Sequence, residues 1–491
     1  MSEKTFLDLW SYSNTYTDKK SHSTGDGKEL CDLLVVFGND VLIFSDKEID
    51  WPGGSDLNTS WRRWYKRAVQ KSVNQVLGAA RWIENYPERI FLDPSCNCHF
   101  PFPLPPASDL NLHLICVAAG AEAAGCSYHG SRTSWSINTS IKGPQHTTNS
   151  DCMQPLVCGD INPSGKFVHL FDRPGLDVLM TELDTVSDFC RYLTERENFL
   201  RNSAGIFCSR EADLLAAYLS EEDDQGRHIF PSEAVTAETF IEIQPGLYDV
   251  LTERPEYKAK VEENQVSYLW DALISKFTET VLDDTYIPHP DHHVSQKIIE
   301  EGLRILAAED RTCRRAHSLS FEGIVELQKS TGQDRVTRVV LPINNNLEKR
   351  TCYVFLLLKY PLNLPRPIPD EQYRRVRSGM LETYAYAALL KFRDKADRIV
   401  GIALNGPEGG HPEHGHSEDL LVLEVDEWTD DLIKDVRERQ KKFDVMDESR
   451  LSMSDISVQE YPNRPEPPKA SRQQRRYRER QRKKALRRKE S

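Results

Sequence analysis

The chain has 491 residues, which is too long for one compact hydrophobic core and predicts two or three domains. Its apolar runs reach about ten residues, half of what a bilayer requires, and the opening MSEKTFLDLW lacks a basic-then-apolar signal layout. The eleven cysteines are odd in number and show no repeated spacing, which argues against a disulfide framework. These features predict a cytoplasmic protein without a membrane partner.

The net charge of −13 is unevenly distributed along the chain. Residues 471–491 hold eleven Lys and Arg against two Glu, so the rest of the chain carries about −22. The overall acidity therefore does not exclude nucleic acid as a partner, because a basic tail of this kind neutralises phosphates. A solvated tail without a specific partner explains the composition equally well.

In chain order, the first predicted element is a short amphipathic segment whose apolar residues are Phe6, Leu9 and Trp10. A polar loop is expected over residues 15–28. Residues 30–37 and 41–44 are apolar and β-branched around a Gly-Asn-Asp turn, which predicts a β-hairpin. A helix should follow, with Thr59 or Ser60 as its N-cap and with apolar positions at helical spacing from Trp61 to Ala80.

Two further strands and a helix complete the first predicted domain, residues 1–202. The strands are expected at residues 111–119 and from Phe167 onward, and the helix over residues 183–200. Residues 203–310 are acid-rich and helical in pattern and contain no motif of known chemistry.

A second α/β domain is predicted over residues 311–446. Its strands are expected at residues 335–343, 350–360, 398–405 and 419–425, and its helices at residues 370–392 and from residue 430. Its order of elements repeats that of the first domain, and ordinary α/β architecture explains this better than an inactive duplicate. Residues 447–491 are polar, Pro-rich and then basic, which predicts a disordered linker and tail. The fold class is mixed α/β.

The hairpin carries the chemistry that points to function. Residues two apart in a strand share a face, so Ser45 and Lys47 point the same way, and Asp32 on the paired strand can meet them. A carboxylate, a hydroxyl and an ammonium in one place suit phosphodiester hydrolysis assisted by a divalent ion.

This arrangement resembles the PD-(D/E)xK restriction-endonuclease-like superfamily, especially its nuclease-related branch, over about residues 1–120. In that superfamily an acid opens the second strand, (D/E)-x-K lies on the third, and the next helix carries a glutamine. Asp32 matches the acid, Lys47 the lysine, and Gln70 or Gln75 the glutamine, with Gln70 taken as the site residue. The resemblance implies a mixed sheet flanked by helices and Mg²⁺ or Mn²⁺ as cofactor.

Ser45 departs from this pattern, because the family usually has an acid there, and the helix over residues 61–83 offers no acid to replace it. Asp46 and Glu48 face away from Lys47 in an unbroken strand, so either needs a bulge to reach a metal. The other acids available to complete the site are Glu29, Glu3 and Asp8. The metal ligands are predicted to be Asp32 and Glu29.

The polar side of the predicted helix holds Arg62, Arg63, Lys66, Arg67, Gln70 and Lys71, with no acid among them. A solvated face usually mixes signs, so this one predicts contact with the phosphate backbone of DNA or RNA, through Arg63, Lys66 and Arg67. Two plainer interpretations remain: a solvated basic face, and an Asp32–Lys47 ion pair at the hairpin edge that contributes little.

Other groups of metal-binding residue types carry weaker signals. They are Cys96, Cys98 and His99, the run His289 to His293, and the loop histidines His411, His414 and His416. None has the paired spacing of a structural zinc site, and solvated side chains explain them better. The chain also lacks a phosphate-binding GxxxxGK[ST] loop and a GxSxG elbow.

Two functions therefore remain open. The first is a metal-dependent nuclease in which Asp32, Ser45, Lys47 and Gln70 are catalytic. The second is an inactive nuclease fold that serves as a nucleic-acid-binding or scaffold module.

Overall fold

The protein is described here by a computed structural model that covers residues 5–20, 26–54, 56–148, 153–223, 226–231, 240–283, 285–286, 296–343, 347–361, 368–407, 410–411, 415–446, 452 and 458–462. The basic tail at residues 471–491, the histidine run at residues 289–293, Glu3 and His414 lie outside the described residues. Over the described residues the fold is mixed α/β, as predicted, and contains three mixed sheets.

The N-terminal sheet has the strand order β1-β2-β3-β4-β7. The predicted hairpin is confirmed as β2 (Lys28–Phe37) and β3 (Asp40–Glu48), and the sheet continues in parallel through β4 (Asn111–Ala119) and β7 (Val168–Phe171). The expectation of a loop from residue 15 is wrong at its start, because β1 (Ser11–Thr17) pairs antiparallel with β2. This edge strand is polar, and its Thr and Tyr residues favour extended backbone without apolar alternation.

The predicted helix lies across the N-terminal sheet as one long element. It consists of α3 (Leu57–Tyr65), a π-helical turn (Lys66–Gln70) and α4 (Lys71–Asn85), and α4 packs on β2, β3 and β4. Its N-cap is Asp56 and not Thr59 or Ser60, because the Asp56 carboxylate accepts hydrogen bonds from the backbone N–H groups of Asn58 and Thr59 (3.3 and 3.0 Å).

The opposite face of this sheet is covered by α6 (Arg173–Glu182) and α7 (Val186–Asn202). Beside them a second sheet has the order β6-β5-β8-β9. Its strands are β5 (Ser136–Lys142), β6 (Val157–Asp160), β8 (Gly205–Cys208) and β9 (Phe240–Glu242). Because β8 pairs with β5, this sheet continues across the domain boundary predicted at residue 202.

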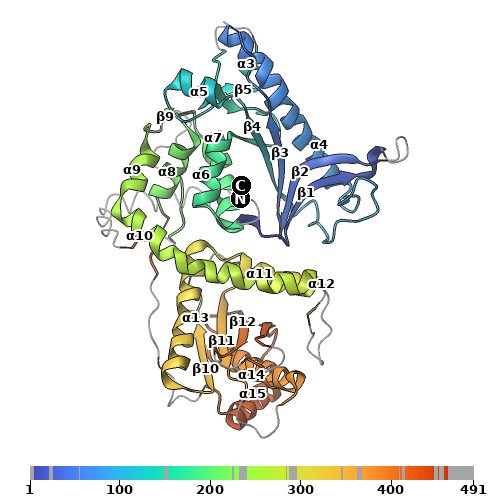
Figure 1. Cartoon of the computed structure of the whole chain (residues 1–491), viewed down its shortest axis with the longest axis vertical. Coiled ribbons are helices and arrows are strands. Elements are labelled where there is room, and N and C mark those ends of the chain that lie inside the picture. Colours follow the sequence, from blue (N-terminus) through green and yellow to red (C-terminus); the bar gives the residue numbers. More distant parts are fainter. Residues whose placement is uncertain are drawn as a thin grey trace.

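The region after β8 is mainly helical. Its elements are α8 (Glu211–Ser220), α9 (Leu247–Glu253), α10 (Pro255–Glu263), α11 (Tyr268–Leu282) and α12 (Gln296–Ala307). Figure 1 shows α11 and α12 lying between the N-terminal part and the second α/β part of the chain. Among the described helices, none combines the length and apolar character needed to cross a membrane.

The third sheet has the order β10-β11-β12-β13 and confirms the strands predicted for the second α/β region. They are β10 (Arg335–Val340), β11 (Thr351–Leu358), β12 (Arg398–Asn405) and β13 (Glu418–Glu424). One face packs on α13 (Arg311–Thr331), and the other on α14 (Asp370–Lys391), which in turn packs on α15 (Asp430–Phe443). A single apolar cluster runs from Phe6 to Ile402, so the two parts share a continuous core.

Candidate active site at the end of the hairpin

The structure brings Asp32, Ser45 and Lys47 together at the end of β3, and adds Gln75 from α4. Ser45 Oγ and Lys47 Nζ both donate to Gln75 Oε1, each at 3.0 Å. Asp32 Oδ2 accepts a hydrogen bond of 2.6 Å from the backbone N–H of Asp46. The predicted meeting of the carboxylate, hydroxyl and ammonium therefore has a fourth member, an amide.

The strand register explains this convergence. The β2–β3 pairing runs to Leu33 opposite Phe44, so Asp32 lies beside the end of β3. On the other side of β3, Ser45 lies opposite Cys116 of β4 and Lys47 opposite Ala118. Ser45 is fully buried, whereas Lys47 and Asp32 are half-buried, so the two charged groups remain accessible while the hydroxyl does not.

A β-bulge in β2 brings Glu29 to the same site. Thr15 of β1 pairs with Cys31 and the next residue, Tyr16, pairs with Glu29, so Leu30 is the extra residue in β2. The carboxyl groups of Glu29 and Asp32 are close enough to interact electrostatically. Burial and this carboxyl neighbour raise the pKa of Glu29, while the positive charge of Lys47 opposes the shift.

Gln75, and not Gln70, is the glutamine at the site. Gln70 is exposed at the end of the π-helical turn, within the run of basic residues. The turn accommodates one extra residue and so changes the rotational phase of the helix, which places Gln75 against β3. The sequence contained a signal for this choice, because Gln75 flanks the apolar stripe that includes Val73 and Val76.

The remaining acids near the motif do not join this site. β3 is regularly paired with β4 as far as Glu48, so the bulge that Asp46 or Glu48 needs is not present. Their carboxylates instead lie 3.5 and 3.2 Å from the guanidinium of Arg173. Burial raises the pKa of Asp46, and Arg173 opposes that shift. Asp8 is exposed.

The Asp32–Lys47 ion pair of the plainer interpretation is absent among the described residues. Lys47 forms no ion pair with a carboxylate in this set, and its Nζ donates a hydrogen bond to the neutral amide of Gln75. Gln75 Oε1 accepts both hydrogen bonds, and within the same described set no acceptor is bonded to its amide nitrogen. The ammonium and the amide N–H groups are therefore able to donate to an incoming phosphate or water.

The donor set at this site fits a hard divalent cation. Glu29 and Asp32 bring two interacting carboxyl groups together, and a shared cation would relieve their repulsion. Mg²⁺ and Mn²⁺ prefer oxygen ligands, and Mg²⁺ is commonly held by one or two carboxylates together with water and phosphate oxygens.

The basic helix face extends from this site over the first residue of α4, the π-helical turn and α3. Arg63, Lys66, Arg67 and Lys71 are exposed, and within the described ranges none of them lies in an ion pair. The helix is held in place by Trp64, whose indole N–H donates to the Ile49 carbonyl just after β3 (2.8 Å). Four unpaired cations on one helix face form a positively charged surface.

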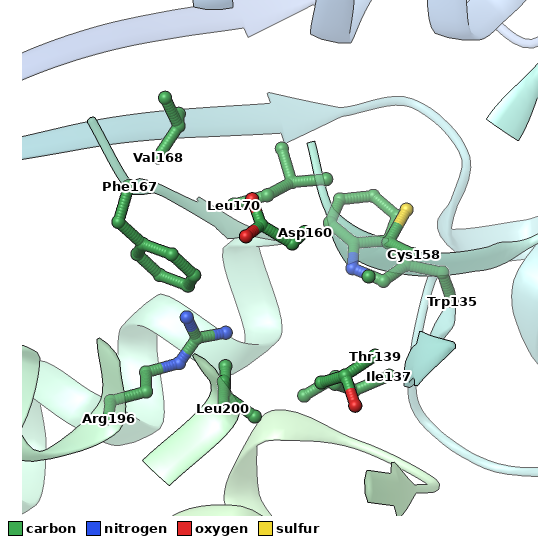
Figure 2. Close-up of a pocket in the computed structure, with 11 residues that line it drawn as sticks. Trp135, Ile137, Thr139, Cys158, Asp160, Phe167, Val168, Leu170, Arg196 and Leu200 are labelled. Carbon is green, nitrogen blue, oxygen red and sulfur yellow. The ribbon is translucent and has the colours of Figure 1, made fainter. Parts of the chain in front are cut away.

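The pocket drawn in Figure 2 lies elsewhere, among β5, β6, β7 and α7. Its charged lining groups are already engaged: Arg196 pairs with Glu211 at 2.7 Å, and Asp160 with Arg201 at 3.0 Å. The other lining side chains shown are mainly apolar, such as Phe167 and Leu200. The pocket therefore offers no free charged group for catalysis.

The weaker sequence motifs form no metal cluster among the residues that the structure describes. Cys98 and His99 are exposed, and the His99 ring packs against Phe91. His411 is buried against Tyr360, whereas His416 is exposed.

Compared with known proteins, the chain matches no family model, no curated protein and no solved structure. The candidate site therefore rests on the geometry and chemistry of this chain alone.

Proposed function

We propose that the N-terminal part of the chain is a metal-dependent nuclease of the restriction-endonuclease-like class that hydrolyses phosphodiester bonds in DNA or RNA. The observation that carries the proposal is the convergence of Asp32, Glu29, Ser45, Lys47 and Gln75 at the end of one hairpin. The order of β1, β2, β3, α4 and β4 supports it, because the same order of elements surrounds the motif in that superfamily.

In this proposal Asp32 and Glu29 hold Mg²⁺ or Mn²⁺, which polarises the phosphate and lowers the pKa of a bound water when present. Lys47 orients the attacking water and donates to the charge that develops on the phosphate. Gln75 fixes the Lys47 ammonium, and Ser45 holds the Gln75 carbonyl oxygen from the other side.

The basic face supplies the substrate-binding part of the proposal. Arg63, Lys66 and Arg67 steady the phosphate backbone, because these exposed cations form no ion pair within the described part of the chain that phosphate binding would have to break. Contacts of this kind position the nucleic acid without reading its sequence.

The test is a cleavage assay with the full-length chain, because the sheet β6-β5-β8-β9 crosses residue 202 and a fragment ending there would lose β8 and β9. Labelled single- and double-stranded DNA and RNA are incubated with Mg²⁺, with Mn²⁺ or with a chelator. We expect cleavage only with metal, and Asp32→Ala and Lys47→Ala should each lower the rate at least about 100-fold. Calorimetric titration should show weaker Mn²⁺ binding by Asp32→Ala.

Glu48→Ala is the matched control, since Glu48 is next to Lys47 in sequence and contacts Arg173 on the other side of the strand. It should cleave at the wild-type rate. If the folded wild-type chain leaves all four substrates intact with either metal, the nuclease proposal fails.

The second candidate function is an inactive nuclease fold that binds nucleic acid or acts as a scaffold. It is favoured by Ser45, a fully buried hydroxyl at the position where the family usually has an acid. This candidate predicts binding that weakens with salt, is insensitive to Mg²⁺ and occurs without cleavage. Metal-dependent binding, measured by fluorescence anisotropy with and without chelator, would count against it.

A further inference from the structure

A second group of metal-binding side chains lies on the other face of the N-terminal sheet. Asp40 at the start of β3, His113 on β4 and Cys190 on α7 place their donor atoms within 4.8 Å of one another. Among the described residues it is the only such group of three. His113 Nε2 is 3.0 Å from Asp40 Oδ1, and His113 and Cys190 are buried while Asp40 is half-buried.

The strand register explains why these residues meet. In the parallel β3–β4 pair, Asp40 lies opposite Asn111 and Leu42 lies opposite His113. His113 is therefore on the same face of the sheet as Asp40, on the neighbouring strand and two positions further along it. Leu42 belongs to the apolar cluster that includes Cys190 of α7. Ser45 and Lys47 are at the opposite end of β3 and on its other face, against α4. The two sites are therefore separate.

We propose that Asp40, His113 and Cys190 bind one divalent cation of the zinc class. The set offers one carboxylate oxygen, one imidazole nitrogen and one sulfur, a mixture that suits Zn²⁺ and does not suit Mg²⁺. Metal–ligand bonds of 2.0–2.3 Å in a tetrahedral site imply donor separations of about 3.3–3.8 Å. The Asp40–His113 separation of 3.0 Å would therefore lengthen slightly, and a separation as large as 4.8 Å would shorten by about 1 Å, when an ion binds. Three protein ligands leave the fourth coordination position for a water molecule. Asp40 is partly exposed, so this side of the group faces solvent.

Such an ion would join three parts of the chain that are distant in sequence. It would hold the turn of the β2–β3 hairpin to β4 and to α7, whose ligands lie at residues 40, 113 and 190. Because the unfolded chain has no preformed site, binding stabilises the folded state. We expect saturating Zn²⁺ to raise the melting temperature of metal-stripped protein by about 5 °C or more.

The test measures metal binding directly in the full-length chain. Metal content is determined by mass spectrometry after purification without chelator, and Co²⁺ is then titrated into metal-stripped protein. We expect one equivalent of zinc and a thiolate-to-cobalt charge-transfer band in the near ultraviolet. Cys190→Ser should abolish the band, and His113→Gln and Asp40→Asn should weaken Co²⁺ binding at least about tenfold.

Three variants provide controls. Cys352→Ser removes a buried thiol of β11, and Cys98→Ser removes an exposed thiol beside another cysteine and a histidine; both should keep the band. Asp32→Ala should keep it too, because Asp32 belongs to the hairpin site, so failure of the nuclease proposal would not affect this result. Asp40→Asn changes a partly exposed residue, so it remains informative if Cys190→Ser does not fold. Absence of bound metal, or a band lost with Cys98→Ser and kept in Cys190→Ser, would overturn the proposal.

Discussion

At the scale of single residues, one amide oxygen organises the candidate active site. Gln75 Oε1 accepts hydrogen bonds from the Ser45 hydroxyl and the Lys47 ammonium, so it positions Lys47 without neutralising the lysine charge. A carboxylate in the same place would lower the electrostatic attraction of Lys47 for a phosphate. The neutral partner therefore preserves the positive charge that the proposed reaction needs.

Gln75→Ala should lower the cleavage rate about 10- to 100-fold with little change in melting temperature. The physical reason is that Lys47 loses the hydrogen bond to Gln75 that positions its ammonium, and a small displacement of a catalytic group lowers the reaction rate. Asn74→Ala, at an exposed neighbour on α4, is the control and should leave the rate unchanged. Equal rates for the two variants would remove Gln75 from the site.

A buried ion pair beside the pocket of Figure 2 allows a prediction about stability. Glu211 receives two hydrogen bonds from Arg196 (2.7 and 2.8 Å) and one from Tyr192 (2.6 Å), and both charged side chains are buried. Glu211→Ala should lower the free energy of unfolding by about 3–5 kcal/mol, because it leaves the Arg196 charge buried without its partner. Urea denaturation measures this change. Glu371→Ala, which breaks the exposed pair with Arg375, should leave the free energy unchanged within error.

At the scale of elements, two local irregularities assemble the candidate site. The bulge at Leu30 brings Glu29 beside Asp32, and the π-helical turn at residues 66–70 sets the phase of α4 so that Gln75 faces β3. Both irregularities insert one residue into an otherwise regular element. Features of this kind concentrate near functional sites.

The basic face of α3 and the π-helical turn should control nucleic-acid affinity. Arg63→Ala combined with Arg67→Ala should lower the slope of log K against log salt by about two, because each cation neutralises about one phosphate. Binding is measured by fluorescence anisotropy at several salt concentrations. Lys434→Ala with Arg437→Ala, which removes two exposed cations of α15, is the control. A similar loss in both double variants would mean that only the overall charge matters.

At the scale of the whole molecule, residues 458–462 near the C-terminus dock on the central helices. The Glu460 carboxylate lies 2.7 Å from His228 and 2.7 Å from Lys260 of α10, and both partners are buried or nearly so. The backbone carbonyl of Gln459 accepts a hydrogen bond from Arg315 of α13. Residues 458–462 therefore supply, through Glu460, the negative charge that compensates the positive charges of His228 and Lys260.

The docking of this segment should depend on pH. Burial raises the pKa of Glu460, but the charges of His228 and Lys260 bring it well below its ordinary value. Burial alone would lower the pKa of His228, and Glu460 raises it above its ordinary value. The Glu460 contribution is present above its unfolded pKa of about 4.3 and is lost as the pH falls through the depressed folded value. The His228 contribution is present below about pH 6.5 and is lost as the pH rises through its raised value.

Glu460→Gln should therefore destabilise the docked segment most between about pH 5 and 6.5, and less at pH 8. Hydrogen exchange of residues 226–231 and 255–263, compared between the variant and wild type at each pH, measures the effect. Glu253→Gln, at an exposed residue paired with Lys258, is the control. A difference that does not change with pH would contradict the role of His228.

Much of the fold could be predicted from the sequence, because helices and strands that are buried on one face repeat their apolar residues at a regular spacing. The hairpin, the long helix, β4 and the strands of the third sheet were predicted close to their observed bounds. Ser45 and Lys47 both reach the Gln75 oxygen and Asp32 accepts from the backbone between them, an arrangement that strand alternation and a short turn are enough to predict. The polar edge strand β1 and the cap at Asp56 were missed, because neither has an apolar pattern of its own.

The sequence by itself determined the local elements and the residues that one hairpin brings together. Only the tertiary structure decided between Gln70 and Gln75, recruited Glu29 and joined Asp40, His113 and Cys190. These choices depend on a bulge, a π-helical turn and the packing of α7 on the sheet. Each is selected by contacts between segments that are distant along the chain, and local periodicity carries no record of such contacts.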